Sequence, residues 1–427
     1  MSGRVEVEIT GIAAGGAGVG RLPDGRAVFV HGTAPGERAA ARIERARGRW
    51  ATARLLAVLR AAPDRRPAPC PFYGRCGGCT LEHLEYGAQL AAKSRIVADA
   101  IHRIGGIDAA LPPIEPSPHE LRYRNRISFT LLRLSAGRIV AGFHPLDRPA
   151  RVVDVTGACL LPEPAIAEAW DALRRGWGAG ASRLPSGRAL RLTLRSTAKG
   201  SVSLLVDGGY GAGRPDALIE AVPALGAVWQ RHTPSAEPVL LAGAASLDEE
   251  WNGAPVRLEG GVFLQVNRDA AAILQAHVLA RAGADLEGAK VVDAYCGIGI
   301  YSRALAERGA RVVGIELDAA AVREAVRAAP RAVRFIAGRV EDALPHELPA
   351  DLVIANPPRA GLDAAVCAAL GGAPPRRILY ISCDAATLAR DLARLGDAFT
   401  LRSLHCFDLF PQTAHVESVA ELVCATT

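Results

Sequence analysis

Three of the nine cysteines in this 427-residue chain stand close together. Cys70, Cys76 and Cys79 form the pattern C-x5-C-G-G-C, and Cys159 is a fourth candidate after a long gap. Zinc sites typically use paired C-x2-C units, whereas three close thiolates and a remote one suit a cubane iron–sulfur cluster. The glycines let the backbone pass close to an inorganic core. We therefore expect a closed 4Fe-4S site held by these four thiolates; the alternative is a group of unliganded, buried cysteines.

A short glycine turn, Gly297-Ile298-Gly299, follows an apolar stretch and opens a helical one. Glycines let the backbone approach a ligand, and a helix N-terminus favours negative charge. Ser302 stands where the dinucleotide fingerprint has its third glycine, which counts against NAD. Glu316 ends the next apolar stretch, where a carboxylate can accept both hydroxyls of a ribose, and Asn356 ends another. This combination predicts a pocket for S-adenosylmethionine; the alternative is the same fold without a cofactor.

Cys383 and Glu417 could supply the chemistry beside such a pocket. Cys383 directly follows the apolar stretch 377–382, where a thiolate can act as a nucleophile. Glu417 is a carboxylate in an apolar neighbourhood, hence a candidate base with a raised pKa. Taken singly, Cys383 is more simply a packing residue and Glu417 a solvated one. A methyl-donor site beside them makes catalytic roles the better interpretation. His415 nearby either orients a substrate or is structural.

The last third of the chain has the pattern of a parallel sheet covered on both faces. A helical stretch, 301–309, separates the first two apolar strands, as in a βαβ unit. The carboxyl ends of parallel strands meet at one edge, where doubly wound folds bind ligands. We therefore expect an α/β domain of the doubly wound, Rossmann-like class. Its predicted parallel strands are 290–296, 310–318, 333–338, 351–357 and 377–383.

The first two thirds differ in kind. Short strand patterns separated by glycine and proline predict a small β-barrel over residues 1 to about 60, and 62–69 is a candidate linker. The region up to about residue 262 has a mixed α+β pattern, with one helix from Leu81 to Ile104. The predicted barrel strands are 4–13, 25–32, 37–44 and 50–59, and those of the mixed region include 188–195 and 201–206.

Positive charge is concentrated in the first segment. Residues 1–66 contain 12 arginines and no lysine against six acidic residues, an excess equal to the net charge of +6 of the whole chain. Forked guanidinium groups hold phosphates well. The alternative is a solvated surface, since arginine is the usual cation of this chain. The charge supports nucleic-acid binding without establishing it. The most crowded arginines are Arg42, Arg45, Arg47, Arg49 and Arg54.

Composition excludes several classes of protein. Half of the residues are hydrophobic and 22% are charged, which is a globular composition and neither collagen-like nor wholly disordered. The N-terminal MSGRVEVEIT lacks the apolar core of a signal peptide, and no apolar run of about 18 residues predicts a membrane span. We therefore expect a cytoplasmic protein in a reducing compartment, where clustered cysteines are metal ligands or catalysts.

Several segments, taken together, form a specific set: the four cysteines above, 263–267, 293–297, 356–362, 382–384, 387–391 and 408–417. With this set the chain resembles the bacterial RNA (uracil-5-)-methyltransferases over nearly its whole length. The basic N-terminal barrel is similar to a TRAM domain, of the oligonucleotide-binding type. In that family a TRAM domain with an iron–sulfur cluster is typical of enzymes acting on 23S rRNA, whereas members acting on tRNA usually lack both.

The resemblance implies a division into a TRAM-like RNA-binding barrel (1–62), a central domain with the cluster (63–262) and an S-adenosylmethionine-dependent methyltransferase domain (263–427). It implies that Gln265, Tyr295, Glu316 and Asn356 bind the cofactor. Many relatives have aspartate at the position of Asn356, and the amide cannot act as a base. We expect RNA as the partner of a monomer, with no membrane or stable protein partner.

The resemblance also assigns chemistry: Cys383 adds to C6 of a uracil, C5 takes the methyl group, and Glu417 removes the C5 proton to release 5-methyluridine. Three alternatives stay open. A tRNA would replace rRNA as substrate in the same reaction. Asn356-Pro-Pro-Arg359 would be the loop of an amino-methyltransferase, although those carry an aromatic residue after the prolines. A redox-sensing RNA-binding protein with a degenerate methyltransferase domain would keep the cluster and lose the catalytic residues.

Overall fold

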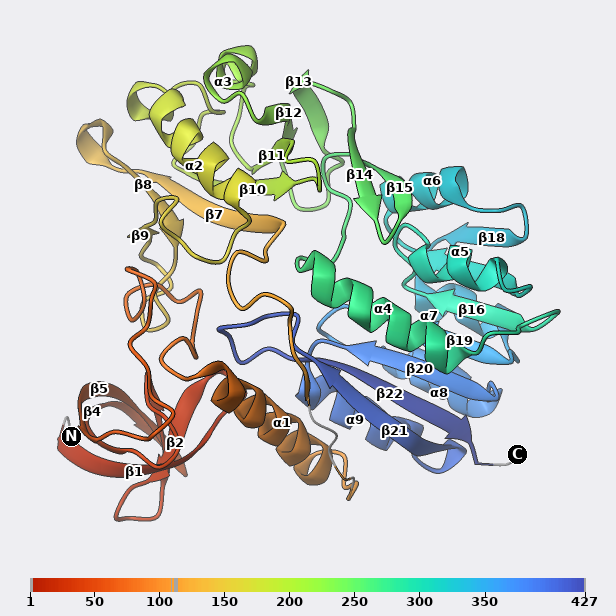
Figure 1. The fold of residues 1–427 in the computed structure, drawn as a ribbon, viewed down its shortest axis with the longest axis horizontal. Coiled ribbons are helices and arrows are strands. Elements are labelled where there is room, and N and C mark those ends of the chain that lie inside the picture. Colours follow the sequence, from red (N-terminus) through yellow and green to blue (C-terminus); the bar gives the residue numbers. More distant parts are fainter. Residues whose placement is uncertain (1–2, 109, 111–113, 426–427) are drawn as a thin grey trace.

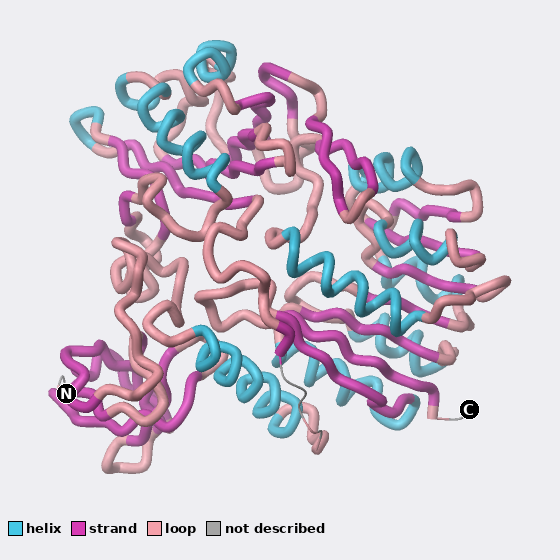
Figure 2. Tube along the Cα trace, in the orientation of Figure 1, coloured by secondary structure: helices cyan, strands magenta, loops and turns pink. Residues whose placement is uncertain are grey.

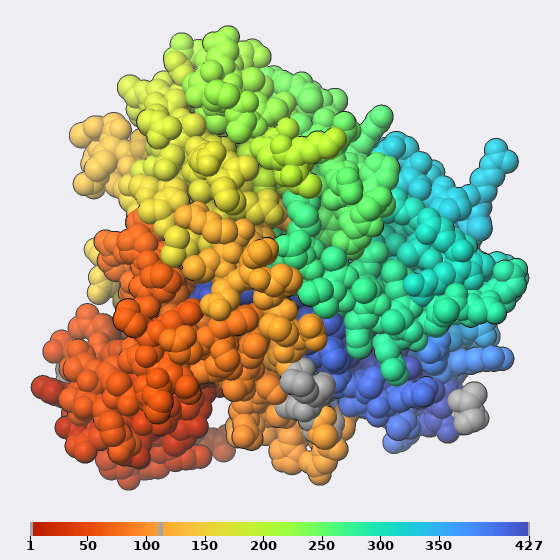
Figure 3. Space-filling view, viewed as in Figure 1, coloured from red at the N-terminus to blue at the C-terminus, as the bar shows by residue number. Residues whose placement is uncertain are grey.

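The computed structural model describes residues 3–108, 110 and 114–425, so the outermost residues of the first and last expected domains lie outside the described chain. Figure 1 shows a small barrel at the N-terminal end, a central sheet with two helices, and a large C-terminal sheet with helices on both faces. Figure 3 shows residues from about 60 to 130, in orange, between the red barrel and the green and blue C-terminal half. In the described residues no helix is long and apolar enough to cross a membrane.

Five strands close the barrel in the order β1-β2-β3-β5-β4 (Figure 2). The sequence predicted four of them and missed β2, whose glycine-rich AGVGR lacks an alternating apolar pattern. Packing requires these glycines: a Cβ at Gly18 would lie 2.0 Å from Thr33 Oγ1, and one at Gly20 would lie 2.2 Å from Val7 Cγ1. The strands are β1 Arg4–Ile12, β2 Ala17–Arg21, β3 Ala27–His31, β4 Arg38–Arg47 and β5 Trp50–Arg60.

The central region is built on a seven-stranded sheet of order β13-β12-β11-β10-β7-β8-β9. One face packs under α2, where the rings of Phe129 and Trp170 stack with centroids 4.1 Å apart. A separate hairpin, β14–β15, leads toward the C-terminal part. The strands are β7 Arg126–Arg133, β8 Ile139–Phe143, β9 Val153–Asp154, β10 Ala189–Ser196, β11 Val202–Asp207, β12 Leu225–Arg231, β13 Val239–Gly243, β14 Leu247–Trp251 and β15 Ala254–Leu258, with helices α2 Pro164–Gly176 and α3 Pro215–Ala221.

The C-terminal sheet has the order β18-β17-β16-β19-β20-β22-β21-β6. Its first five strands are parallel, at the positions that the sequence predicted, and the strand order reverses between β16 and β19. This confirms the doubly wound prediction and creates the switch point where such folds bind ligands. The strands are β16 Lys290–Ala294, β17 Arg311–Glu316, β18 Val333–Ala337, β19 Leu352–Ala355, β20 Arg377–Ser382, β21 Phe399–Phe407 and β22 Glu417–Cys424.

Two apolar layers hold helices on the two faces of this sheet. On one face α4 and α5 cover side chains such as Val291 and Ile354. On the other, α1, α8 and α9 cover the alternate side chains, such as Val292 and Val353. Both faces of the parallel strands are therefore buried, which explains their unbroken apolar sequence. The helices are α4 Arg268–Ala282, α5 Ile300–Ala306, α6 Ala319–Ala328, α7 Val340–Ala343, α8 Ala364–Gly372 and α9 Ala385–Leu395.

The helix expected from Leu81 to Ile104 is shorter: α1 runs over Tyr86–Arg103. The backbone N–H of Leu81 donates to Gln412 O at 3.0 Å, and Leu84 forms a β-bridge with Arg65. These long-range contacts hold 81–84 out of the helix, although its apolar spacing is helical. The helix packs against α9, and the short strand β6, Ile114–Glu115, joins the edge of the C-terminal sheet beside β21.

Candidate active site

Strand ends gather the expected site residues at one edge of the C-terminal sheet. Tyr295, Asn356 and Cys383 follow β16, β19 and β20 directly, and Glu316 is the last residue of β17. Because β17, β16, β19 and β20 are neighbours in the sheet and parallel, these four residues lie along one edge. The N–H of Asn356 donates to Ala294 O at 3.3 Å, which ties the ends of β16 and β19 together.

The glycine turn after β16 serves packing as well as ligand access. Gly297, with φ of 54°, has open space at its Cβ position. Gly299, with φ of 73°, has none, because a Cβ there would lie 2.9 Å from the Phe335 ring. Only Gly297 therefore leaves room for a ligand, whereas Gly299 lets α5 approach the sheet.

Asp293 holds the first turn of α5 in place. Its hydrogen bonds give a structural reason for Ser302 at the position where the dinucleotide fingerprint has its third glycine. Its carboxylate accepts hydrogen bonds from Ser302 N at 2.9 Å and Ser302 Oγ at 2.6 Å. Asp293 is fully buried, its other oxygen has no partner, and burial raises its pKa to about 7. This role was not predicted from the sequence, although a charged residue inside an apolar strand was an available signal.

Glu316 is oriented by two backbone N–H groups. One carboxylate oxygen accepts from Gly297 N at 3.0 Å, and the other accepts from Asp318 N at 2.7 Å. Each oxygen keeps a lone pair for a further donor. A carboxylate fixed at the end of the second strand is suited to bind the two hydroxyls of a ribose.

Gln265 lies in the segment just before α4. Its backbone oxygen accepts from Asn125 Nδ2 at 3.0 Å, so the central region holds this segment in place. Asn267, two residues later, caps α4 by accepting from Ala270 N. Gln265 itself is half-buried.

The pairing of β20 with β22 brings Cys383 and Glu417 together. In this antiparallel pair Ser382 lies opposite Ser418. One residue beyond Ser382 is Cys383, and one residue before Ser418 is Glu417, so the same register sets the thiol beside the carboxylate. These residues are far apart in the sequence, and the antiparallel register is what unites them.

Both groups hold their protons more tightly than usual. Glu417 is only 2% exposed, one of its carboxylate oxygens has no partner, and burial raises its pKa to about 8. Burial also raises the pKa of the Cys383 thiol, and the Glu417 carboxylate adds to this effect. A positive charge nearby would favour the ionised form of both groups.

Arg359 supplies that charge. It lowers the pKa of both Cys383 and Glu417, opposing the effect of burial. Its Nη2 lies 3.2 Å from Nε2 of His415, whose pKa falls to about 4 through burial and this arginine. From the sequence, Arg359 served only to distinguish the motif from that of an amino-methyltransferase. Its role beside the thiol was missed, because charge within the Pro-Pro-Arg motif has no local signature of its own.

The loop between β21 and β22, residues 408–416, is anchored by elements outside the C-terminal sheet. Lys93 on α1 is fully buried and donates to Asp408 Oδ1 at 2.6 Å. Gln412, also fully buried, accepts at its backbone oxygen from Thr80 N and Leu81 N at 2.9 and 3.0 Å. The segment that follows Cys79 therefore touches the loop that leads to Glu417.

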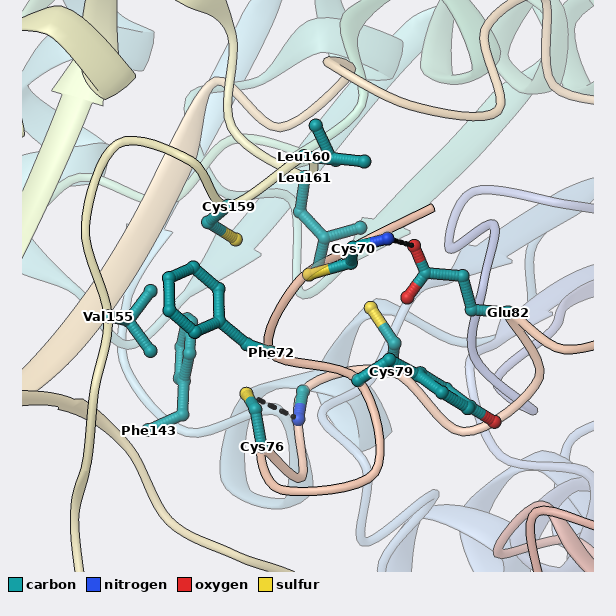
Figure 4. Close-up of a pocket in the computed structure, with 12 residues that line it drawn as sticks. Cys70, Phe72, Cys76, Cys79, Glu82, Phe143, Val155, Cys159, Leu160 and Leu161 are labelled. Atoms are coloured by element: carbon teal, nitrogen blue, oxygen red, sulfur yellow. Dashed lines mark hydrogen bonds between the residues drawn. The ribbon is translucent and has the colours of Figure 1, made fainter. Parts of the chain in front are cut away.

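The four candidate cluster cysteines surround one cavity of about 370 Å³, counting the part that opens to solvent. Figure 4 shows the sulfur atoms of Cys70, Cys76, Cys79 and Cys159 facing this space. The N–H of Gly78 donates to Cys76 Sγ at 3.3 Å. The distant Cys159 thus lines the same cavity as the triplet. The rest of the lining is mainly apolar and includes Phe72, Phe143, Val155 and Leu161.

These thiols are neutral unless a cation holds their thiolates. Burial raises the pKa of Cys76 to about 11 and that of Cys159 to about 12, and it raises those of Cys70 and Cys79 as well. Among the residues that the structure describes, no three His, Cys, Asp or Glu side chains are arranged to hold a single metal ion.

The arginine cluster of the barrel lies on the β4–β5 hairpin. Arg42 is paired with Arg54 across the two strands, and all five arginines are exposed. Arg54 lies 3.6 Å from Glu44. In the described part of the chain the other four, Arg42, Arg45, Arg47 and Arg49, have no ion pair. They are free to meet an anionic partner.

Family models match three parts of the chain. A TRAM domain matches residues 3–56, a methyltransferase domain matches 292–357, and a tRNA (uracil-5-)-methyltransferase model matches 328–423. The last match contains Asn356, Arg359, Cys383 and Glu417. The first coincides with the five-stranded barrel.

Similar proteins cover the whole length. An uncharacterized RNA methyltransferase of Gloeobacter violaceus is 38% identical over 98% of this chain and 96% of its own length. Another, of Halalkalibacterium halodurans, is 31% identical over the same shares. The crystal structure of Pyrococcus abyssi tRNA (uracil-54, C5)-methyltransferase in complex with S-adenosyl-L-homocysteine superposes with a TM-score of 0.75 and 26% identity, covering 98% of this chain and 99% of that one.

Proposed function

Since the chain belongs to the S-adenosylmethionine-dependent RNA methyltransferases with a TRAM domain and a tRNA (uracil-5-)-methyltransferase domain, we propose that it methylates C5 of a specific uridine in 23S rRNA. The observation that carries this proposal is the β20–β22 register, which sets the Cys383 thiol beside the buried Glu417 carboxylate. A thiol and a carboxylate at one ligand-binding edge supply the two functions that C5 methylation needs.

Cys383 is the nucleophile in this proposal. C5 of uracil attacks a methyl donor poorly until a thiolate adds to C6 and makes C5 enolate-like. Arg359 lowers the pKa of the thiol and so favours the thiolate. The same positive charge would stabilise the negative charge that develops on the enolate, an effect that is strong in a site shielded from water.

S-adenosylmethionine, when bound, supplies the methyl group that forms the new bond to C5. The adduct then carries both the methyl group and the original proton on C5. Glu417 removes that proton, the electron pair re-forms the C5–C6 double bond, and the Cys383 sulfur leaves as a thiolate. A base with a pKa of about 8 is well matched to operation near neutral pH. Its buried, unpartnered oxygen is free to accept the proton.

Four residues of this chain would hold the methyl donor. Glu316 binds the ribose, because its carboxylate is fixed by two backbone N–H groups and retains free lone pairs. Gln265, Tyr295 and Asn356 line the remainder of the pocket. Asn356 donates or accepts hydrogen bonds as a neutral amide, toward the donor or the pyrimidine, and leaves the base function to Glu417.

We also propose that Cys70, Cys76, Cys79 and Cys159 hold a 4Fe-4S cluster. The fit rests on four thiols around one largely apolar cavity, and on an N–H···S bond to Cys76 of the kind that tunes such clusters. When bound, the cluster supplies structural support for the segment that touches the 408–416 loop.

The cluster proposal is tested by the metal content of protein purified without oxygen. Brown protein with equal amounts of iron and acid-labile sulfide is the expected result, and Cys159→Ser should lose both. A colourless, iron-free preparation with full methylation activity would contradict the proposal.

The second candidate substrate is tRNA, because the Pyrococcus abyssi enzyme, named for uracil 54 of tRNA, matches this chain over nearly its whole length. The choice of rRNA rests on the family pattern that joins a TRAM barrel to a cysteine cluster, and not on the overall match, since the tRNA enzyme covers 98% of this chain. In either RNA the target base must leave the stack to reach Cys383, which costs least in a loop. Free arginines of the β4–β5 hairpin would bind phosphates around it.

The experiment that tests the function uses radiolabelled S-adenosylmethionine with unmodified 23S rRNA and unmodified tRNA. Nuclease mapping should locate the label on the base of one uridine in 23S rRNA. Label in tRNA alone would keep the reaction and overturn the substrate. Label on an exocyclic nitrogen, or no label in either RNA, would overturn the reaction.

A further inference from the structure

The second face of the central sheet carries arginines along β7 and β10, and a small apolar cluster around Leu205 and Trp229 on β11 and β12. Side chains alternate along strands, so β7 and β10 send one apolar set toward α2 and a polar set to the opposite side. The apolar set is Ile127, Phe129, Leu131, Leu190, Leu192 and Leu194. Two hydroxyls meet there, Ser128 Oγ and Thr193 Oγ1, at 2.8 Å. We call this the arginine face and define it by Arg126, Arg191 and Arg195.

Two guanidinium groups lie side by side on this face. Arg126 on β7 is directly opposite Arg195 on β10, two strands that lie side by side in Figure 1. Arg195 is only 8% exposed, and its Nη2 has no hydrogen-bond partner. Within the described residues neither arginine forms an ion pair, and nearby acids are engaged elsewhere. Asp207 pairs with Arg231 at 2.7 Å, and Glu249 pairs with Arg268 at 2.7 Å.

This arrangement is unfavourable for the protein alone. Burial lowers the pKa of Arg195 to about 9 and Arg126 adds to the effect, while Glu249 opposes it only in part. Burial and then Arg191 lower the pKa of Arg126, and Asp207 opposes this only in part. A buried charge without a partner destabilises a fold, and a second charge of the same sign beside it increases the cost. Violations of this kind are expected at functional sites. The missing component is an anion.

The arginine face extends to the active site. Asn125, next to Arg126, holds the backbone of Gln265 through its amide. Arg124 is two residues before Arg126, and its guanidinium lies 5.9 Å from the ring centroid of Phe410, in the loop that leads to Glu417. Arg191 is exposed and opposite Thr130. At about 3.4 Å per residue, the row from Arg124 to the level of Arg191 spans about 20 Å.

We propose that the arginine face binds the sugar–phosphate backbone of the RNA strand that carries the target uridine. Arg126 and Arg191, which reach solvent, contact phosphates, and Arg195 beside Arg126 contributes its charge and its free N–H. A row of cations about 20 Å long that ends beside the loop leading to Glu417 fits a polyanion better than a single small anion. The proposal rests on the proposed function for the identity of the strand, but its test measures binding and not methyl transfer.

The first experiment measures the affinity of a fluorescein-labelled, unmodified RNA stem–loop with uridines in its loop, over a series of salt concentrations. Arg126→Gln and Arg195→Met should each raise the Kd about tenfold, and each should reduce the slope of log K against log salt by about 0.7 per lost phosphate contact. Arg331→Gln is the control, because Arg331 is exposed, lies outside the central sheet and forms no ion pair among the described residues. It should leave both values unchanged.

The second experiment separates binding from folding. Arg195→Met should raise the Tm of the RNA-free protein by about 2–4 °C, because the substitution removes a buried, unpartnered charge. A merely structural arginine would lower the Tm on removal. Binding of S-adenosyl-L-homocysteine, followed by calorimetry, should not change.

Weaker RNA binding together with higher stability supports the proposal. An unchanged Kd and an unchanged salt slope in both variants would overturn the proposal. A lower Tm of Arg195→Met, together with loss of S-adenosyl-L-homocysteine binding, would also overturn it. If both variants lose RNA affinity while the wild type methylates no uridine, the proposed function fails and the RNA site stands. If the wild type methylates its uridine and both variants bind RNA normally, the RNA site fails and the proposed function stands.

Discussion

Replacing Glu417 by glutamine should make the protein more stable and almost inactive. The folded-state pKa of about 8, against an ordinary value of 4.5, means that between these pH values the folded protein holds a proton that the unfolded chain lacks. Stability therefore falls as pH rises through this window. At about 1.4 kcal/mol per pH unit, ionisation of Glu417 in the unfolded chain lowers the free energy of unfolding by about 1 kcal/mol at pH 5 and about 3 kcal/mol at pH 7. Glutamine does not titrate, so the variant escapes the cost.

Urea unfolding of the wild type and Glu417→Gln at pH 5 and pH 7 measures this difference. The variant should gain about 1 kcal/mol at pH 5 and about 3 kcal/mol at pH 7. Glu421→Gln is the matched control, since Glu421 is a buried glutamate on the same strand that pairs with Arg281 and Arg377. Removing that partner should destabilise the protein. A Glu417→Gln variant without a pH-dependent gain would refute the burial argument.

The same variant should lose about 10²- to 10⁴-fold in turnover, the usual contribution of a general base. Proton removal is then the blocked step, so a covalent protein–RNA adduct should accumulate and appear as a slow band on a denaturing gel. An inactive variant that forms no adduct would show that Glu417 acts earlier in the reaction.

Three further predictions concern the reactive pair. Methyl transfer should rise with pH between about 6 and 8, because both Cys383 and Glu417 have raised pKa values and act in their ionised forms; a flat or falling pH–rate profile would contradict these roles. Cys383→Ala should abolish methyl transfer while S-adenosyl-L-homocysteine still binds by calorimetry, whereas Cys424→Ala, a half-buried cysteine at the end of the same sheet, should remain active. Arg359→Met should move the pH profile of Cys383 alkylation by iodoacetamide to higher pH, since its charge lowers the thiol pKa; an unmoved profile would remove Arg359 from the site.

Local patterns were enough to predict the doubly wound sheet and most of the residues at the carboxyl ends of its strands. Unbroken apolar strands with a glycine turn, a terminal Glu316 and a terminal Cys383 follow from short stretches of sequence. The three closely spaced cysteines and Cys159 line one cavity, and their role as cluster ligands stays a prediction.

Features that depend on long-range strand pairing could not be predicted from the sequence. Nothing local fixes the register that puts Cys383 beside Glu417, because the two strands meet only in the folded sheet. The same holds for Arg126 opposite Arg195, and for the contact between Leu81 and Gln412 that delays the start of α1. Strand β2 was missed because its glycines are selected by close packing and not by alternation.

The most direct test of C5 methylation follows the proton that Glu417 removes. RNA transcribed with uridine tritiated at C5 should release one tritium into water for each methyl group transferred, and Cys383→Ala should release none. Methyl transfer to the RNA without release of tritium would show that another atom is methylated and would contradict the mechanism.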